Sequence, residues 1–411
     1  MKRIGLLVLG VCLVIGACSD TKKIAPKEGR ISVISGKEIE KSGEKVRLIK
    51  ASNTNEWTAP NTNIYNKIPA VSLTKATPAW KVSGAEGRSK NDLPMLTPVI
   101  VGNRIYTLDT ESRLFARNSK DGKELWRIDL GTKAQGVGLT ANKKQIIALD
   151  EHGIVKAFDI EGKELWKKDF KTAFRNSPLM TNESVYLLSL DNNFWVLNAK
   201  TGKEKWHYKT TENQTLLRGM GSPSLANNVV VVPFSSGEVI AFDSTTGVLL
   251  WSQDLVGKKA FDAVADLTQM SASPVIDNGI VYLVGHGGKT MAVNLKTGES
   301  LWQLERGGKT TPLVNGNALF FMDNKNNLLA INKKSGKLFW EVALENLVWK
   351  GPYLIDEKLF LFSDEKSVLV EPQDGKITYQ KARIEGSNPA LVDDGLFFLG
   401  DNGKLYHWEK I

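Results

Sequence analysis

The residue types that most often carry chemistry are few in this sequence and lie far apart. The histidines fall in separate segments, and no two of them have the spacing of a metal-ligand pair; they are His152, His207, His286 and His407. A zinc site assembled from distant parts of the fold stays open, but no local pattern indicates one. No Gly-x-Ser-x-Gly nucleophile motif occurs. The sequence therefore predicts no catalytic, cofactor-binding or metal-binding residues.

Two glycine-rich stretches resemble the end of a phosphate-binding loop. They are Gly287-Gly288-Lys289-Thr290 and Gly307-Gly308-Lys309-Thr310. A phosphate loop has another Gly five residues before the second Gly of this pattern, where Leu283 and Gln303 stand here, and a helix follows it. A strand pattern follows both stretches instead, so we expect hairpin turns.

The first residues predict export. Two basic residues precede an apolar run from Ile4 to Ile15, which is too short for a permanent membrane span and is typical of a signal peptide. The run ends in Ile15-Gly16-Ala17-Cys18, which resembles the lipobox of bacterial lipoproteins; ordinary secretory cleavage beside an incidental Cys is the alternative. The resemblance implies removal of residues 1–17 and acylation of Cys18. Ser19, rather than Asp, in the next position implies sorting to the outer membrane.

Residues 18–73 are rich in Lys, Glu, Ser, Asn and Gly and have no sustained period. We expect a flexible, lipidated tether with a root-mean-square reach of about 40 Å. Trp57 and the Ile64-Tyr65 pair are its candidates for a docked segment. The net charge of +9 is spread along the chain without a basic run, which argues against nucleic-acid binding.

From residue 74 onward the sequence repeats one pattern: alternating apolar residues, Asp or Asn, a turn Gly, and an aromatic residue four positions after the Gly. The unit Ala-Phe-Asp-Ile-Glu-Gly-Lys-Glu-Leu-Trp, residues 157–166, is a clear copy. The same Gly-to-aromatic interval recurs at Gly122/Trp126, Gly162/Trp166, Gly202/Trp206, Gly247/Trp251, Gly298/Trp302, Gly336/Trp340 and Gly375/Tyr379. A position repeated in every unit serves the architecture, so we assign these aromatic residues to packing between sheets.

Each unit reads as four short strands, the first of which starts at a Ser-Pro, Thr-Pro or related pair. Units of about 40 residues with four strands are propeller blades. The last unit, from Asn388, has residues for three strands only, whereas Trp80-Lys81-Val82 is a fourth strand without a unit. We predict an all-β, eight-bladed β-propeller of four-stranded antiparallel blades over residues 74–411, with the last blade closed by this N-terminal strand.

The repeats resemble the quinoprotein-like (PQQ-type) repeat and cover residues 74–411. Together with the lipobox, the chain resembles the BamB family of lipoproteins, which belong to the complex that assembles β-barrel proteins in the bacterial outer membrane. The resemblance implies a non-catalytic, outer-membrane, periplasm-facing scaffold without a cofactor. It also implies binding to BamA, the barrel-forming subunit, to other complex members and to unfolded outer-membrane proteins. The alternatives are a PQQ-dependent oxidoreductase and a periplasmic propeller that binds glycan or another ligand. The quinoprotein dehydrogenases carry an adjacent Cys pair, which is absent here because Cys12 lies in the signal peptide and only Cys18 remains.

Two connections between units are longer than the others. They run from Trp206 to Ser222 and from Trp251 to Ser273, whereas the equivalent interval from Trp302 ends already at Thr311. Connections of one kind emerge on one face of a propeller, so we expect the two long loops to lie side by side. Extended loops on a rigid scaffold are where binding concentrates.

The first long loop contains Leu216-Leu217-Arg218-Gly219, which resembles the Leu-Arg-Gly segment that BamB proteins use to contact BamA. An apolar pair beside an Arg suits an interface anchor. In the second loop, the family's acidic pair is replaced by Gln269 and Ser271. The alternative is that Leu216 and Leu217 pack the loop onto the disc and that Arg218 caps a carbonyl.

Overall fold

The computed structural model describes residues 39–411 except for 52–53, 60, 73–79, 90–91, 133, 175, 211–220, 256–271, 287, 383–384 and 409–411. Ile39–Ile411 form one compact unit. Its described secondary structure consists of β-strands, and no helix among these residues has the length and apolar character needed to cross a membrane.

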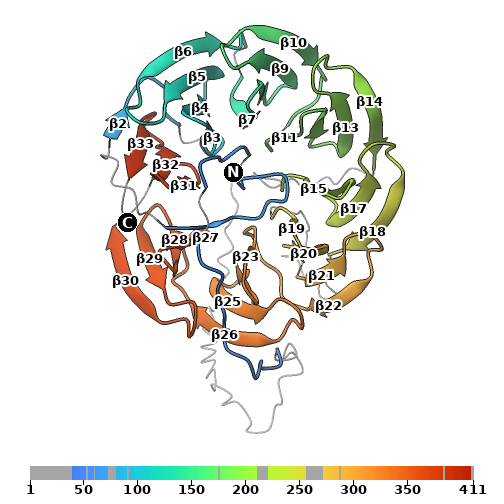
Figure 1. The fold of residues 1–411 in the computed structure, drawn as a ribbon, viewed down its shortest axis with the longest axis vertical. Coiled ribbons are helices and arrows are strands. Elements are labelled where there is room, and N and C mark those ends of the chain that lie inside the picture. The colour runs from blue at the N-terminus through green and yellow to red at the C-terminus, as the bar shows by residue number, and fades with distance from the viewer. Residues whose placement is uncertain are drawn as a thin grey trace, which may run out of the picture. The chain divides into compact units, whose positions relative to one another are not determined.

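The strands form eight sheets arranged as a ring of blades (Figure 1). Blade 1 consists of β3 (Val99–Val101), β4 (Arg104–Leu108), β5 (Arg113–Asn118) and β6 (Glu124–Asp129), and blade 2 of β7 (Gly136–Ala141), β8 (Gln145–Asp150), β9 (Ile154–Asp159) and β10 (Glu164–Asp169). Blade 3 consists of β11 (Leu179–Met180), β12 (Ser184–Leu188), β13 (Asn193–Asn198) and β14 (Glu204–Lys209). Blade 4 consists of β15 (Ser224–Ala226), β16 (Val229–Pro233), β17 (Glu238–Asp243) and β18 (Leu249–Asp254).

Blades 5 to 8 continue the series and include two strands from the N-terminal part of the chain. Blade 5 consists of β19 (Val275–Asp277), β20 (Ile280–Val284), β21 (Thr290–Asn294) and β22 (Ser300–Leu304), and blade 6 of β23 (Leu313–Asn315), β24 (Ala318–Met322), β25 (Asn327–Asn332) and β26 (Leu338–Ala343). Blade 7 consists of β1 (Ala70–Val71), β27 (Lys350–Ile355), β28 (Lys358–Phe362), β29 (Lys366–Val370) and β30 (Ile377–Ala382). Blade 8 consists of β31 (Ala390–Val392), β32 (Gly395–Leu399), β33 (Leu405–Trp408) and β2 (Trp80–Val82). The predicted eight-bladed, all-β fold is confirmed.

The N-terminal strand closes blade 8 as predicted. β2 pairs antiparallel with β33, with Trp80 opposite His407 and Val82 opposite Leu405. The Trp80 ring also lies 5.9 Å from the ring of Phe397, measured between centroids. Two segments from opposite ends of the chain therefore share one sheet.

The repeated Asp, Gly and Trp residues join neighbouring blades, and blade 4 illustrates the geometry. The Asp243 carboxylate accepts hydrogen bonds from the backbone amides of Thr245 and Thr246, and Gly247 follows with φ +75°. A Cβ on Gly247 would lie 2.7 Å from the Trp206 ring of the preceding blade, and the indole N–H of Trp206 donates to the Ser244 carbonyl at 3.2 Å. Each such Trp thus packs on the turn of the next blade, which confirms the packing role predicted for it.

The other joints repeat this hydrogen bond from an indole N–H to the turn of the following blade. The pairs are Trp126 to Ile160, Trp166 to Ala199, Trp251 to Leu295, Trp302 to Lys333 and Trp340 to Pro372. The repeat therefore defines contacts between blades as well as strands within them.

We expect Gly247→Ala to lower the free energy of unfolding by about 2–4 kcal/mol, because a Cβ both strains the positive φ and overlaps the Trp206 ring. Gly279→Ala is the matched control, since Gly279 has φ +77° but nothing within 4 Å of its Cβ position. This control should lose about 1–2 kcal/mol, the cost of the backbone conformation alone. Denaturant unfolding of both variants measures the difference, and equal losses would contradict the joint contact.

Residues 39–72, predicted to belong to a flexible tether, are instead packed against the propeller in their described part. We call these residues the strap. It begins at the rim of blade 6, where Lys41 bridges to Leu338, and it crosses that blade with a hydrogen bond between the Arg47 carbonyl and the Asn317 amide. The compact unit accordingly starts at Ile39 and not at residue 74.

The strap then passes inside the ring of first strands, along their inner edges (Figure 1). Trp57 and Ile100 exchange two backbone hydrogen bonds of 2.8 Å in blade 1. The carbonyls of Ile64 and Tyr65 accept from the first strands of blades 4 and 5, and β1 pairs parallel with β27 in blade 7. Trp57, one of the candidates for docking, has 0% exposure.

Buried side chains of the strap complete this contact. The Asn66 amide donates to the carbonyls of Ser222, Pro223 and Pro274 at 3.0–3.2 Å. Its partners belong to two blades, so one amide links the strap to both. The prediction of a flexible tether failed here for a physical reason. Hydrogen bonds between polar groups and strand edges hold this segment, and such contacts require no periodic pattern of apolar residues in the sequence.

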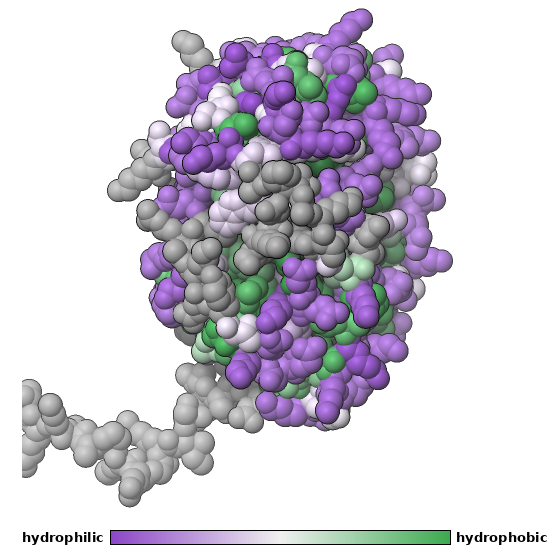
Figure 2. Space-filling model, turned by 60° about the vertical axis from the view of Figure 1, so that its left-hand side comes forward, coloured by the Kyte–Doolittle hydropathy of each residue, from purple (hydrophilic) through white to green (hydrophobic). Residues whose placement is uncertain are grey.

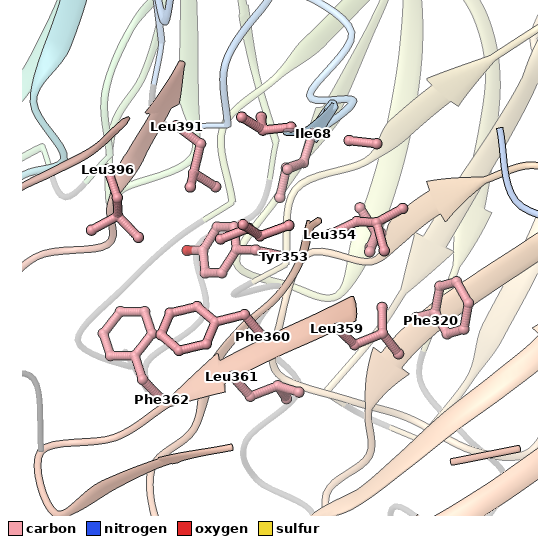
Figure 3. Packing of buried hydrophobic residues seen from close by; sticks show 14 of the residues in the cluster. Ile68, Phe320, Tyr353, Leu354, Leu359, Phe360, Leu361, Phe362, Leu391 and Leu396 are labelled. Carbon is pink, nitrogen blue, oxygen red and sulfur yellow. The ribbon is translucent and has the colours of Figure 1, made fainter. Parts of the chain in front are cut away.

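The strap shares the largest apolar cluster with blades 6, 7, 8 and 1. Figure 3 shows Ile68 of the strap among the side chains of Tyr353, Leu354 and Leu391. Met95, from the segment before β3, joins the same cluster. The outer surface in Figure 2 is mostly hydrophilic. The strap thus packs its apolar side chains against four of the blades.

Candidate partner-binding face

The residues predicted to bind a partner lie outside the described residues. They are Leu216, Leu217, Arg218, Gly219, Gln269 and Ser271, and the same holds for the lipidation residue Cys18. Their roles stay predictions. The described residues that flank the two long loops show how the scaffold holds them.

The loops return to the disc next to each other. A Cβ on Gly221 would lie 2.4 Å from the Ala272 carbonyl oxygen, and the Ser222 amide donates to the Ser273 hydroxyl at 2.9 Å. Gly221 ends the first loop and Ala272 ends the second. The described ends are therefore adjacent, in keeping with the expectation that the loops share one face.

Hydroxyl groups before the strand-starting prolines connect the blades beneath these loops. The Ser222 hydroxyl donates to the Ser177 carbonyl at 3.2 Å, and the Ser273 amide donates to the Thr311 hydroxyl at 3.0 Å. With the bond between Ser222 and Ser273, these contacts link the first strands of four consecutive blades. Sequence reasoning used the prolines as strand markers and missed the hydroxyls, although their recurrence before Pro was the available signal.

The outgoing ends of both loops are also fixed. The Thr210 amide donates to the Asn192 carbonyl at 3.2 Å, and the Leu255 amide donates to the Gly237 carbonyl at 3.1 Å. Leu255 is 1% exposed and packs against Gly285. Each loop thus starts and ends on a rigid, hydrogen-bonded frame.

Charged groups beside this frame are matched internally. Burial would raise the pKa of Asp191, but hydrogen bonds from Ser189, Asn193 and Thr172 outweigh it and lower that pKa. Burial, aided by Lys309, lowers the pKa of His286, so its imidazole is neutral at pH 7. Both groups are thus held by contacts within the frame.

Two of the histidines have structural roles in the described part of the chain. His207 stacks on Trp195 with 5.2 Å between ring centroids, and the fully buried His407 stacks on Phe397 at 4.4 Å. The described residues contain no group of three or more His, Cys, Asp or Glu that could hold a metal ion.

One of the two glycine-rich stretches is a hairpin turn and the other is not. Gly288 to Thr290 belong to the β20–β21 hairpin, where the Gly285 amide donates to the Lys289 carbonyl. Residues 307–310 instead connect β22 to β23, and Gly308 bridges to Asp323 in blade 6. That prediction was wrong because β22 is the outermost strand of its blade, so the chain must cross to the next one.

Comparison with known proteins identifies similar sequences. A family model described as "Outer membrane protein assembly factor BamB" matches residues 66–161 and 136–342. The protein of that name from Nitrosomonas eutropha is 24% identical over 230 residues, which are 56% of this chain and 55% of that protein. The one from Moranella endobia is 25% identical over 331 residues, 77% of this chain and 75% of that protein. The chain thus spans about half to three quarters of the length of these two relatives.

Solved structures share the fold. The crystal structure of BamB from Moraxella catarrhalis has a TM-score of 0.68 at 16% identity and covers 80% of this chain and 100% of that one. A quinohemoprotein alcohol dehydrogenase from Comamonas testosteroni reaches 0.64 at 12% identity, with 85% of this chain and 77% of that one covered. At these identities the likeness shows the fold alone, and the fold is shared by an assembly factor and an enzyme.

Proposed function

Because the chain belongs to the family of the outer membrane protein assembly factor BamB, we propose that it is a non-catalytic scaffold subunit of the machinery that assembles β-barrel proteins in the outer membrane. In this proposal it binds a BamA-like barrel-forming subunit and aids the insertion of barrel proteins. Unfolded outer-membrane proteins and other members of the complex are further partners.

The observation that carries the proposal is the pair of long loops on a fixed frame. Their described ends are adjacent at Gly221 and Ala272, and hydrogen bonds hold the strands beneath them. A rigid base lowers the entropy that loops lose on binding, so it favours a defined contact over a diffuse one.

Within the loops, the proposed contacts are Leu216, Leu217, Arg218 and Gly219, with Gln269 and Ser271 on the second loop. Leucine side chains contribute desolvated apolar area, and an Arg guanidinium adds charge-assisted hydrogen bonds to a carboxylate or carbonyl. Gln269 and Ser271 are uncharged, so we assign the larger share of the binding free energy to Leu217 and Arg218.

Attachment to the membrane is proposed through a lipid on Cys18, with the propeller on the periplasmic side. The strap fixes where the chain meets the propeller, since Lys41 bridges to Leu338 at the rim of blade 6. In this proposal the lipid-linked segment joins the propeller at blade 6. The two long loops, one between blades 3 and 4 and one between blades 4 and 5, belong to other blades and stay available for a partner.

The oxidoreductase alternative shares the fold. In this chain the strap packs Trp57 and Ile68 together with Met95 in one buried apolar cluster. Apolar contacts of this kind stabilise the ring, which suits a scaffold.

Co-purification of the partner tests the proposal. We expect Arg218→Glu in the full-length, membrane-anchored protein to reduce recovery of the BamA-like subunit at least tenfold, because the charge reversal removes the hydrogen bonds and repels an acidic partner surface. Arg127→Glu is the control, since its side chain is 51% exposed on the outer strand of blade 1. Undiminished recovery with Arg218→Glu would overturn the interface, and equal losses with both variants would show a non-specific charge effect and overturn it too.

A further inference from the structure

One position of the repeat carries a tyrosine in three blades. It lies on the second strand and holds Tyr106 in blade 1, Tyr186 in blade 3 and Tyr282 in blade 5, whereas blades 6, 7 and 8 have Phe320, Phe360 and Phe397 there. All six rings are buried, with exposures of 3% or less. A phenylalanine therefore satisfies the packing, and each hydroxyl needs a separate explanation.

Two of the three hydroxyls have partners at equivalent places. Tyr106 interacts with Arg104, two residues earlier, and the Arg104 guanidinium continues to Glu161 of blade 2 at 2.8 Å. Tyr186 hydrogen bonds with Ser184, at the position of Arg104, and with Ser244 in the turn of blade 4. In both blades the hydroxyl thus helps to join the neighbouring blade.

Tyr282 lacks both partners. Ile280 stands where Arg104 and Ser184 stand in the other blades, and it has no polar side-chain atom. Lys333 stands where Ser244 stands, but its ammonium donates to the Asp277 carboxylate at 2.8 Å. The Tyr282 hydroxyl is buried and has no hydrogen-bond partner among the described residues. Leaving a buried hydroxyl unpaired destabilises the fold, and a Phe would avoid that cost.

A cavity of about 530 Å³ adjoins Tyr282 between the strap and blades 5 and 6. Its lining includes Arg47 of the strap and Lys333 and Lys334 of blade 6. Two carboxylates oppose these cations: Glu44 pairs with Arg47 at 3.1 Å, and Asp277 binds Lys333.

A third lysine, outside the cavity lining, adds positive charge next to Asp277. Lys67 of the strap also contacts Asp277, at 2.5 Å, so one carboxylate is shared by two ammonium groups. Burial would raise the pKa of Asp277, but its hydrogen bonds from Lys333 and Lys67 lower it. The Tyr282 hydroxyl stays protonated, because burial raises its pKa. The site thus offers a neutral O–H donor beside an excess of cationic donors.

We propose that this cavity binds a small ligand that carries an oxyanion, either a phosphate or a carboxylate, with the Tyr282 hydroxyl and the Lys333 ammonium as its donors. The ligand would supply the hydrogen-bond partner that the Tyr282 hydroxyl lacks, since Ile280 stands where Arg104 and Ser184 stand in the other blades. Because the strap forms one wall, binding would also tie the strap to blades 5 and 6. The proposal does not depend on the partner-binding loops.

Titration with inorganic phosphate and, separately, with acetate tests the site on the full-length protein, at constant ionic strength set with chloride. We expect saturable binding of at least one probe, followed by calorimetry and by a rise in melting temperature. Tyr282→Phe should weaken that binding at least fivefold, whereas Tyr186→Phe is the matched control and should leave it unchanged. The probe that binds more tightly identifies the oxyanion class. Absence of saturable binding by either probe, or equal binding by wild type and Tyr282→Phe, would overturn the proposal.

The stability of the two variants without probe gives an independent readout. Tyr186→Phe removes two hydrogen bonds and should lower the melting temperature. Tyr282→Phe removes an unpaired hydroxyl and should leave the melting temperature unchanged or raise it. A loss for Tyr282→Phe as large as that for Tyr186→Phe would mean that the hydroxyl has an internal partner, and it would overturn the proposal.

Discussion

A chain that begins at Ser83 is expected to lose cooperative thermal unfolding or to melt at least 15 °C below the full-length protein. Such a chain lacks both the strap and β2, the fourth strand of blade 8. The edge of β33 would then be unpaired, and Gly122 of blade 1 would lose the Trp80 ring that packs on its turn. An open ring exposes two sheet edges, which also favours aggregation.

Two longer chains separate the contributions. A chain that begins at Ile39 keeps every described contact and should melt like the full-length protein. A chain that begins at Thr74 keeps β2 but lacks the strap, so its melting temperature should fall between the other two. Circular dichroism during heating measures all three. If the chain from Ser83 melted with the chain from Ile39, closure by β2 would contribute nothing and the expectation would fail.

The second large effect concerns the strap alone. We expect Trp57→Ala to lower the free energy of unfolding by about 3–5 kcal/mol, the range for removing a buried Trp from a core. Trp57 has 0% exposure and lies in the apolar cluster that spans blades 6, 7, 8 and 1. Neighbouring residues can therefore fill the cavity left by the indole only if several blades move.

Tyr65→Ala provides the comparison within the same segment. The Tyr65 side chain is 43% exposed, and its contact with Ile276 uses the backbone carbonyl, which the substitution retains. This control should lose less than about 1 kcal/mol in denaturant unfolding. Similar losses for both variants would mean that the strap is held by its backbone and not by the Trp57 ring.

The blades were predictable because the same sequence pattern recurs in each of them. Alternation marks the third strand, the Asp and Gly mark the turn, and Trp marks the fourth strand, so each copy supports the others. Closure by Trp80 to Val82 followed from counting strands in the last unit. The second glycine-rich stretch was mistaken because residues 307–310 look locally like a hairpin, whereas only strand order shows that β22 ends a blade.

Sequence reasoning named Trp57 and the Ile64-Tyr65 pair as candidates for docking but missed the rest of the strap, for a physical reason. Its bonds run from backbone groups and from Asn66 to strand edges that exist only in the finished ring. Composition alone therefore suggested a tether. The residues predicted to bind a partner were inferred from loop length and resemblance. The structure adds the described residues that flank the two loops, including the Ser and Thr hydroxyls that no spacing argument had singled out. The unpaired Tyr282 hydroxyl needed three blades to be compared in space.

The strap also fixes an order of events during maturation of the chain. The Thr54 backbone amide donates a hydrogen bond to the Asp393 carboxylate, 339 residues further along the chain. This part of the strap can therefore bind only after blade 8, near the end of the chain, has formed. Contacts this distant form slowly, because the loop between them must close first. We therefore expect the strap and the closing strand to pair late in folding, after the last blade has formed.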